Sequence, residues 1–239
     1  MVASDGPSGG GADDGGFDDG GFDGAVLHRV PRQARSREKV VRALAAAERL
    51  LERDGAPALT VTGVAREAGL SVGALHQYLP DREAMTRALL TRYHARFERL
   101  LARLVEEAAG RPGGIGELDV VVAAFADLHR RSAGVRALRG ERPDSEPETR
   151  EHKARMAALL LRLLRELGLL AGVSDDRAAL VARTAFATAD ALMHEAFRED
   201  PEGDPRLLAE LDRLLAAYLH AAAADGTPTR DAGSSGPAG

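Results

Sequence analysis

The segment VTGVAREAGLSVGALHQYL, residues 61–79, carries the pattern of two short helices joined by a tight turn. The first helix is predicted over Val61–Ala68 and the second over Val72–Tyr78, with Gly69 and Ser71 in the turn. Glycine ends a helix well because it adopts the left-handed conformation without a Cβ penalty. A serine before a helix is a good N-cap, since its hydroxyl accepts a backbone N–H. This arrangement is typical of a helix-turn-helix, which sets its second helix in the major groove of DNA.

Small and apolar residues fall where such a unit needs them. Ala65 stands at the expected crossing of the two helices, where a larger side chain would push them apart. In the second helix, Val72, Leu75 and Tyr78 form the predicted core stripe, so the opposite face is expected to be exposed. The core shared by the two helices is predicted from Val64, Ala68, Leu70 and Leu75.

The flanking sequence extends the pattern. An amphipathic helix is predicted over about 35–54, ended by Gly55, and downstream Asp81 can cap a long helix that begins at Arg82. A basic arm, one helix, a helix-turn-helix and a basic residue opening helix four follow each other in this order. Over about residues 32–90 the chain therefore resembles the TetR family of transcriptional regulators. The rest is similar to that family only in being a helical region of suitable length.

Two residues depart from the pattern that the resemblance implies. The family usually has Tyr where this chain has His76, and Phe where it has Leu79. Leucine is a tolerable exchange in a core, but His76 replaces a residue that normally contacts a DNA phosphate. The departure keeps a second hypothesis open, namely a helical-bundle dimer of the same fold that binds a ligand or a protein without specific DNA binding.

Composition and patterning predict an all-α protein. The chain has 239 residues, of which 44% are hydrophobic and only 4% aromatic, so the core must be built mainly from Leu, Ala and Val. No stretch of strand length alternates apolar and polar residues. The absence of cysteine excludes disulfides and thiolate metal sites. No signal peptide and no bilayer-spanning run is recognised, and we expect a soluble cytoplasmic protein.

Motifs for catalysis and for cofactors are lacking in the sequence. We find no GxSxG elbow, no phosphate-binding P-loop and no dinucleotide-binding glycine pattern, so we expect neither an enzyme nor a bound cofactor. Histidines are also not at metal-ligand spacing, and four of them fall on four different predicted helices: His94, His129, His152 and His194. Asp190 and His194 share one helix four residues apart, where a hydrogen bond is the simpler interpretation than a metal site.

The net charge of −5 is distributed unevenly. Residues 1–24 carry six Asp and no basic residue, whereas residues 28–107 carry fifteen Lys or Arg against ten Asp or Glu. The positive segment coincides with the helix-turn-helix, which is the electrostatic footprint of a DNA-binding region. We expect the Gly/Asp-rich leader to be disordered, and either inert or a weak competitor of DNA phosphates for the basic arm.

Four parts of the chain are predicted: a disordered acidic leader (1–27), a helix-turn-helix domain (28–80), a helical regulatory and dimerisation domain (81–223) and a disordered tail (224–239). The fourth helix should end near Glu107. The further predicted helices are Glu117–Arg131, Val135–Arg139, Pro147–Leu167, Ser174–Glu199 and Asp204–Ala223.

Candidate DNA contacts follow from the helix-turn-helix and the resemblance. Gln77 can pair with adenine, Ala74 can touch a thymine methyl group, and Arg82 can bind phosphate beside a helix N-terminus. Ordinary surface exposure is the alternative for each, and N-capping alone accounts for Thr60. The full set is Arg32, Arg35, Thr60, Ser71, Gly73, Ala74, His76, Gln77 and Arg82.

A homodimer on a palindromic operator and an unknown small-molecule effector are implied by the resemblance. The effector pocket would be lined by Tyr93, Phe97, Phe125, Met156, Phe186 and Met193, although residues at helical spacing are more often simple core. The last two helices carry a small-residue stripe and an apolar stripe, and the expected interface residues are Ala182, Ala185, Ala189, Leu207, Leu211, Leu214 and Tyr218. Half-sites would lie ~34 Å apart, one helical turn of DNA.

Overall fold

A computed structural model describes residues 34–111, 114–132 and 146–224, together with Gly134, Arg136 and Leu138. Throughout this part of the chain the regular elements are helices, and the all-α prediction is confirmed. The elements are α1 (Ala34–Asp54), α2 (Val61–Ala68), α3 (Val72–His76), α4 (Arg82–Ala108), α5 (Leu118–Arg130), α7 (Pro147–Glu166), α8 (Asp175–Ala196) and α9 (Pro205–Ala224), with 3-10 turns at Ala56–Ala58 and Ile115–Glu117.

Several predictions fall outside the described residues. They include the acidic leader, residues 28–33 of the predicted basic arm (28–37), most of the predicted helix Val135–Arg139 and residues 140–145 of the loop that follows it. The C-terminal tail also lies outside, apart from Ala224, which is the last residue of α9 rather than the first of a tail. The predicted helix ends otherwise agree with the structure to within a few residues.

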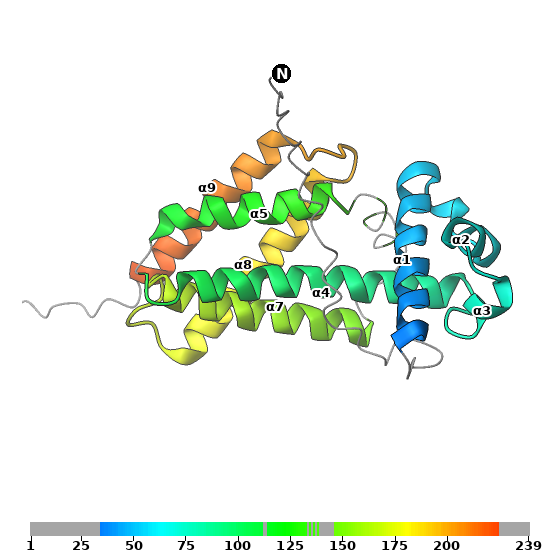
Figure 1. The fold of residues 1–239 in the computed structure, drawn as a ribbon. Helices are drawn as coiled ribbons and strands as arrows, with labels where there is room; N and C mark the ends of the chain where they lie inside the picture. Colours follow the sequence, from blue (N-terminus) through cyan, green and yellow to red (C-terminus); the bar gives the residue numbers. More distant parts are fainter. Residues whose placement is uncertain are drawn as a thin grey trace, which may run out of the picture.

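Helix α4 joins two groups of helices. In Figure 1, α1, α2 and α3 gather at one end of the molecule, and α4 runs from them into a body formed with α5, α7, α8 and α9. One apolar core runs through the junction, since Leu44 of α1, Leu75 of α3 and Leu89 and Phe97 of α4 belong to the same cluster of buried side chains. The N-terminal unit (α1–α3) and the body therefore share packing along α4.

Side-chain caps set the starts of the short helices. The Thr60 Oγ1 accepts from Gly63 N at 3.0 Å, and the Ser71 Oγ accepts from Ala74 N at 3.2 Å. The Asp81 carboxylate accepts from Ala84 N at 2.7 Å and starts α4. These bonds satisfy backbone donors that have no partner inside the helix.

Gly69 ends α2 as predicted. Its backbone adopts φ 63° and ψ 39°, and Leu70 N donates to Ala65 O at 2.8 Å behind it. Non-glycine residues rarely adopt this left-handed conformation, because their Cβ approaches the following carbonyl oxygen. The turn between α2 and α3 therefore depends on the backbone freedom of this one residue.

The predicted core stripe of α3 is partly wrong. Leu75 is buried and Tyr78 is half-buried, but Val72 is 44% exposed and lies outside the core. Helix α3 also ends at His76, so Tyr78 follows the helix instead of closing it. The inner contact is made by Leu75 and Leu79, both fully buried, because a five-residue helix has room for only one inward turn. Val72, at the first helical position, points to solvent.

Helices α8 and α9 pack closely along alanines. Ala178, Ala182 and Ala185 of α8 are buried with Leu211 and Leu215 of α9 in a second apolar cluster. Small side chains let the two helices approach closely. None of the helices described is long and apolar enough to cross a membrane.

We predict that Gly69→Ala destabilises the protein by about 1 kcal/mol, since alanine is strained at positive φ. A Cβ at Gly69 meets no atom within 4 Å, so the cost comes from the backbone conformation alone. Urea unfolding measures it. Gly73→Ala is the matched control: a Cβ there also meets nothing, the residue is helical, and stability should stay equal or rise. Equal stability of the two variants would contradict the role given to Gly69.

Candidate functional site

Helix α3 presents a continuous exposed face. Gly73, His76 and Gln77 are exposed and Ala74 is half-buried, while Leu75 on the other side is held in the core. A Cβ at Gly73 would meet no atom of the protein, so the surface there is open to close approach. The geometry therefore leaves four of the candidate DNA contacts available to a groove.

The other candidate DNA contacts differ in their surroundings. Arg35 at the start of α1 and Arg82 at the start of α4 are both exposed. The hydroxyls of Thr60 and Ser71 accept helix-capping hydrogen bonds, so capping is the role that the structure assigns to them. Arg32 lies outside the described residues. Contact with DNA stays a prediction for every member of the set.

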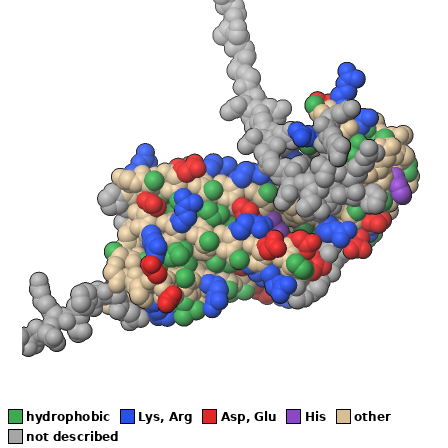
Figure 2. All heavy atoms as spheres, turned by 90° about the horizontal axis from the view of Figure 1, so that it is seen from below, with side chains coloured by type: hydrophobic (Ala, Val, Ile, Leu, Met, Phe, Trp, Pro, Cys, Tyr) green, Lys and Arg blue, Asp and Glu red, His purple; other side chains and the backbone are tan. Residues whose placement is uncertain are grey.

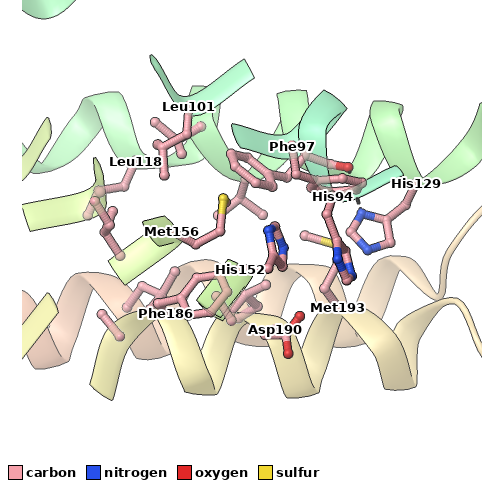
Figure 3. Close-up of a pocket in the computed structure, with 18 of the residues that line it drawn as sticks. His94, Phe97, Leu101, Leu118, His129, His152, Met156, Phe186, Asp190 and Met193 are labelled. Carbon is pink, nitrogen blue, oxygen red and sulfur yellow. Dashed lines mark hydrogen bonds between the residues drawn. The ribbon is translucent and has the colours of Figure 1, made fainter. Parts of the chain in front are cut away.

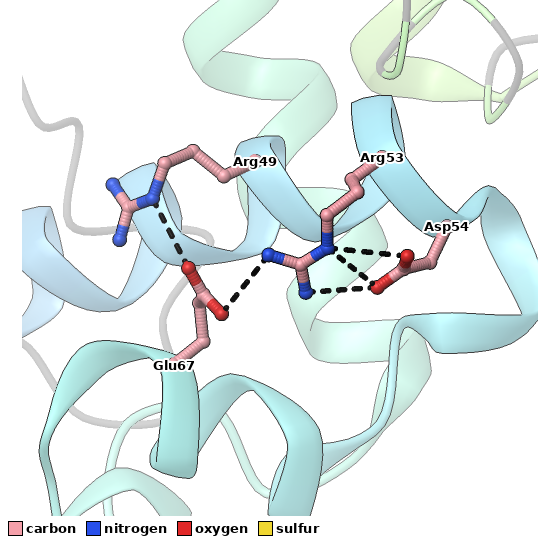
Figure 4. A network of polar contacts seen from close by, with 4 residues as sticks. All are labelled: Arg49, Arg53, Asp54 and Glu67. Carbon is pink, nitrogen blue, oxygen red and sulfur yellow. Dashed lines mark hydrogen bonds and ion pairs between the residues drawn. The ribbon is translucent and has the colours of Figure 1, made fainter.

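An ion-pair cluster ties α2 to α1 beside the turn (Figure 4). Glu67 of α2 accepts from Arg49 Nε at 3.3 Å and from Arg53 Nη1 at 3.5 Å. Arg53 also binds Asp54 at 2.8 Å, and this hydrogen bond lowers the pKa of the Asp54 carboxyl below its ordinary value. Exposed pairs contribute little stability singly, but a carboxylate held by two guanidinium groups fixes the angle between α1 and α2.

A second, more buried cluster ties α1 to α4. Glu48 of α1 lies 2.9 Å from Arg96 Nη2 and 3.9 Å from Arg92 Nε, and all three side chains are largely covered. Burial, together with the charge of Glu48, raises the pKa of the neighbouring Glu52 carboxyl. The N-terminal unit is therefore bound to α4 through charges as well as through the shared core.

The segment after α5 also touches α1. A Cβ built on Gly134 would lie 2.7 Å from Leu51 Cβ and 2.9 Å from the backbone nitrogen of Glu52. Only glycine fits there without a shift of α1. The body thus contacts α1 from two sides, through α4 and through Gly134.

A cavity of about 90 Å³ lies inside the body, between α4, α5, α7, α8 and α9 (Figure 3). Its walls are mostly apolar, and Phe97 and Phe125 pack against each other in the lining with ring centroids 5.5 Å apart. All six predicted pocket residues line this cavity: Tyr93, Phe97, Phe125, Met156, Phe186 and Met193. Ligand binding there stays a prediction, but the structure brings the six side chains together.

Histidines form a polar end of the cavity that the sequence did not reveal. His94, His129 and His152 line it together with Asp190. The His94 and His152 rings are parallel, with centroids 4.0 Å apart. These residues come from four helices, α4, α5, α7 and α8, so no spacing in the sequence could bring them together. In the described part of the chain, no group of three or more His, Asp or Glu is arranged to hold a metal ion.

His152 and Asp190 each have a charged partner outside the cavity lining. His152 Nδ1 lies 2.7 Å from Glu98 Oε1, and Arg155 Nε donates to the same carboxylate at 3.0 Å. Burial raises the pKa of Glu98, but the hydrogen bonds and charges of His152 and Arg155 outweigh it and hold the pKa below its ordinary value. Asp190 pairs with Lys153 at 3.4 Å. Glu98 is therefore a carboxylate at neutral pH.

The predicted dimer residues divide into two groups. Ala182, Ala185 and Leu211 are fully or almost fully buried within the protomer, and their part in an interface stays a prediction. The close approach that their small or apolar side chains permit occurs between α8 and α9 of one chain. Ala189, Leu207 and Tyr218 are half-buried, and Leu214 is 44% exposed.

Apolar residues are exposed on both α8 and α9. Leu180 of α8 is 42% exposed, and Ala187 and Ala191 are exposed on the same helix. On α9 the exposed residues include Leu214 and Ala217. In Figure 2, apolar side chains reach the surface over the body, interspersed with charged ones.

Comparisons with known proteins agree with this architecture. The family model for bacterial regulatory proteins of the tetR family matches residues 43–89, and that for the tetracyclin repressor-like C-terminal domain matches residues 117–219. A TetR-family transcriptional regulator from Streptomyces coelicolor is 30% identical, with a TM-score of 0.60 over 77% of this chain and 97% of that one. The protein belongs to the TetR family of transcriptional regulators, and its N-terminal unit is a DNA-binding domain.

More distant structures share the fold alone. SmeT, the repressor of the multidrug efflux pump SmeDEF of Stenotrophomonas maltophilia, is 22% identical, with a TM-score of 0.57 over 76% of this chain and 88% of that one. The fatty acid degradation regulator FadR from Bacillus halodurans is 16% identical, with a TM-score of 0.56 over 74% and 94%. No curated protein matches the chain significantly.

We predict that Glu98→Gln costs about 1 kcal/mol at neutral pH, because it removes a charged partner of His152 and Arg155. A carboxylate whose pKa is depressed by folding stabilises the protein above its ordinary value of 4.5, and this contribution is lost as the pH falls through the lower folded value. Wild type and variant should therefore converge in acid. Urea unfolding across this pH range measures the difference.

The control is Glu151→Gln, since Glu151 pairs with the same Arg155 at 3.7 Å but is 72% exposed. Its stability should match wild type at every pH. A constant cost of Glu98→Gln down to about pH 3 would mean that shape, and not charge, is responsible.

Proposed function

We propose that the protein is a ligand-responsive repressor that binds a palindromic operator as a homodimer. The main support for this proposal is that α4 both lines the cavity and binds the DNA-binding domain. Tyr93 and Phe97 of this helix line the cavity, while Arg92 and Arg96 hold Glu48 of the DNA-binding domain. A molecule that enters the cavity must press on the same helix that positions the recognition helix.

Operator recognition is supported by the exposed face of α3. A helix whose outer residues are small, such as Gly73 and Ala74, can approach the floor of the major groove closely. Gln77 can then form a bidentate hydrogen bond with adenine. Arg82, at the N-terminus of α4, can bind a backbone phosphate and fix the position of α3 on the duplex.

Dimerisation is supported by the exposed part of α8 and α9. Leu180 and Leu214 are large apolar side chains left partly in solvent, and Ala187 and Ala217 are exposed on the same two helices. A second copy of this surface would cover them and place two α3 helices on one face of DNA, as a two-fold dimer on a palindrome requires.

An effector is supported by the cavity. SmeT, which shares the fold, forms a solved complex with triclosan. In the present chain, a ligand that expands the cavity would displace α1 through the ion pair of Glu48 with α4 and through the close contact of Gly134 with Leu51. Binding would then shift the population away from the conformation that fits two half-sites.

A gel shift against the DNA upstream of the protein's own coding sequence tests the proposal. We expect a specific complex with a two-fold symmetric footprint. Failure to bind this DNA, or any sequence selected from a random pool, would favour the second candidate, a dimer of the same fold that acts without specific DNA binding. The observation behind that candidate is His76, which is exposed on α3 and in its neutral form offers a single donor.

We predict that Arg82→Ala weakens binding to all DNA sequences alike and lowers the salt dependence by about one phosphate contact. Gln77→Ala should instead change the preferred operator, at about 1–3 kcal/mol for the affected base pair. Fluorescence anisotropy across a salt titration measures both. Arg162→Ala, an exposed arginine of α7, is the control and should change neither quantity. Unchanged affinity of Arg82→Ala would remove α4 from the DNA interface.

We predict that the double variant Leu180→Glu with Leu214→Glu is a folded monomer that no longer binds operator, because charges cannot be buried unpaired between two copies. Sedimentation and circular dichroism measure mass and helix content. Val120→Glu is the control, since Val120 is 55% exposed on α5 and should leave the dimer intact. In contrast, Leu211→Glu should unfold the body, since Leu211 is fully buried. A dimeric double variant would place the interface elsewhere.

A further inference from the structure

The hydrogen-bonding atoms at the polar end of the cavity can be assigned from their partners. His152 Nδ1 faces the Glu98 carboxylate at 2.7 Å, so this nitrogen donates. His129 Nδ1 lies 2.9 Å from the Phe125 carbonyl, which can only accept, so it donates as well. A neutral imidazole has one donor and one acceptor, which leaves Nε2 of a neutral His129 ring as an acceptor.

A carboxylate group also lies at this end of the cavity. Asp190, which also lines the cavity, adds carboxylate oxygens that only accept. The Tyr93 hydroxyl and the His94 ring can both donate and accept, so they do not decide whether a ligand group must be a donor or an acceptor. The atoms whose role is fixed, Nε2 of a neutral His129 and the Asp190 oxygens, are therefore acceptors.

The Lys and Arg side chains near the polar end of the cavity bind other groups of the protein. Among the described residues that line the cavity there is no lysine or arginine. Lys153 is paired with Asp190, and Arg155 with Glu98. Arg136 donates to the His129 carbonyl and lies over the Phe197 ring, 4.8 Å from its centroid. A ligand carboxylate would be desolvated near two protein carboxylates without a cation aimed at it, which is costly. A ligand ammonium group would have to compete with Lys153 for Asp190.

The rest of the cavity wall includes aromatic and methionine side chains. Phe97, Phe125 and Phe186 line the cavity beside Met156 and Met193, whose flexible side chains can adapt to a ligand. Phenyl rings pack well against other rings in offset or edge-to-face arrangements. The apolar part of the cavity therefore suits a ring, and the polar end suits a group that donates a hydrogen bond.

We infer that the effector of the proposed regulator is an uncharged aromatic compound carrying a hydroxyl group, which donates to the acceptors supplied by His129 and Asp190. This inference rests on the proposed function only in calling the ligand an effector. The binding preference itself belongs to the cavity and can be measured without DNA.

Four probes of one ring size test the inference: 4-methylphenol, 4-methylanisole, 4-methylbenzoate and 4-methylbenzylammonium. They carry a hydroxyl donor, an ether without a donor, an anion and a cation on the same apolar body. Isothermal titration of the full chain at about pH 8, where ordinary histidines are neutral, gives their dissociation constants. We expect 4-methylphenol to bind at least about tenfold tighter than each of the other three.

Variants of His129 identify the acceptor. His129→Phe keeps a ring but removes Nε2, and should bring 4-methylphenol to within about twofold of 4-methylanisole. His129→Gln supplies an amide oxygen and should retain part of the preference. Phe186→Leu is the control, since it removes ring contacts and should weaken both probes by a similar factor. Circular dichroism checks that each variant is folded.

Three results would overturn the inference: equal affinity of the phenol and the ether, tighter binding of the anion or the cation, or no binding of any probe at millimolar concentration. Each stands apart from the proposed function, which a gel shift with and without 4-methylphenol tests separately. If the phenol binds as expected but leaves the operator complex unchanged, the ligand class holds and the regulatory role fails.

Discussion

The structure depends on the packing of α4 against partners on both of its sides. Adjacent residues of a helix point about 100° apart, so Arg92 and Tyr93 necessarily face different neighbours. The arginines bind Glu48 of α1, while Tyr93 and Phe97 line the cavity. Because close-packed cores transmit displacements instead of absorbing them, a movement of α4 at the cavity cannot stay local. This constraint joins the two halves of the chain, and the contact of Gly134 with α1 adds a second connection.

The DNA-binding domain could be predicted from the sequence because its determinants are local. Thr60, Ser71 and Asp81 each cap a helix through the donor three residues later, and Gly69 adopts the left-handed backbone that the turn requires. Such interactions depend only on neighbouring residues. Val72 was the exception, because its exposure depends on how a very short helix packs on its neighbours. The spacing of apolar residues does not show this packing.

The body was less predictable because its features depend on contacts between distant segments. Apolar spacing identified residues on the inner faces of α4, α5, α7 and α8, and six of them line one cavity. The same reasoning placed Leu211 at a dimer interface, although it is buried against α8 within the protomer. An apolar stripe shows that a face is covered but not by which partner. The grouping of His94, His129 and His152 could not be predicted for a related reason: residues on separate helices have no fixed spacing in the sequence.

We propose that the cavity and the recognition helix are energetically coupled through α4. Thermodynamic linkage makes this testable, since a ligand that weakens operator binding must itself be bound more weakly by the operator complex, by the same factor. Titration of 4-methylphenol into the free protein and into the operator complex measures that factor directly. We expect the operator complex to bind 4-methylphenol more weakly than the free protein does. In Glu48→Gln the ratio of the two affinities should fall towards one, while the affinity of the free protein for the phenol is unchanged. Equal affinity of the free and DNA-bound wild-type protein for the phenol would contradict it.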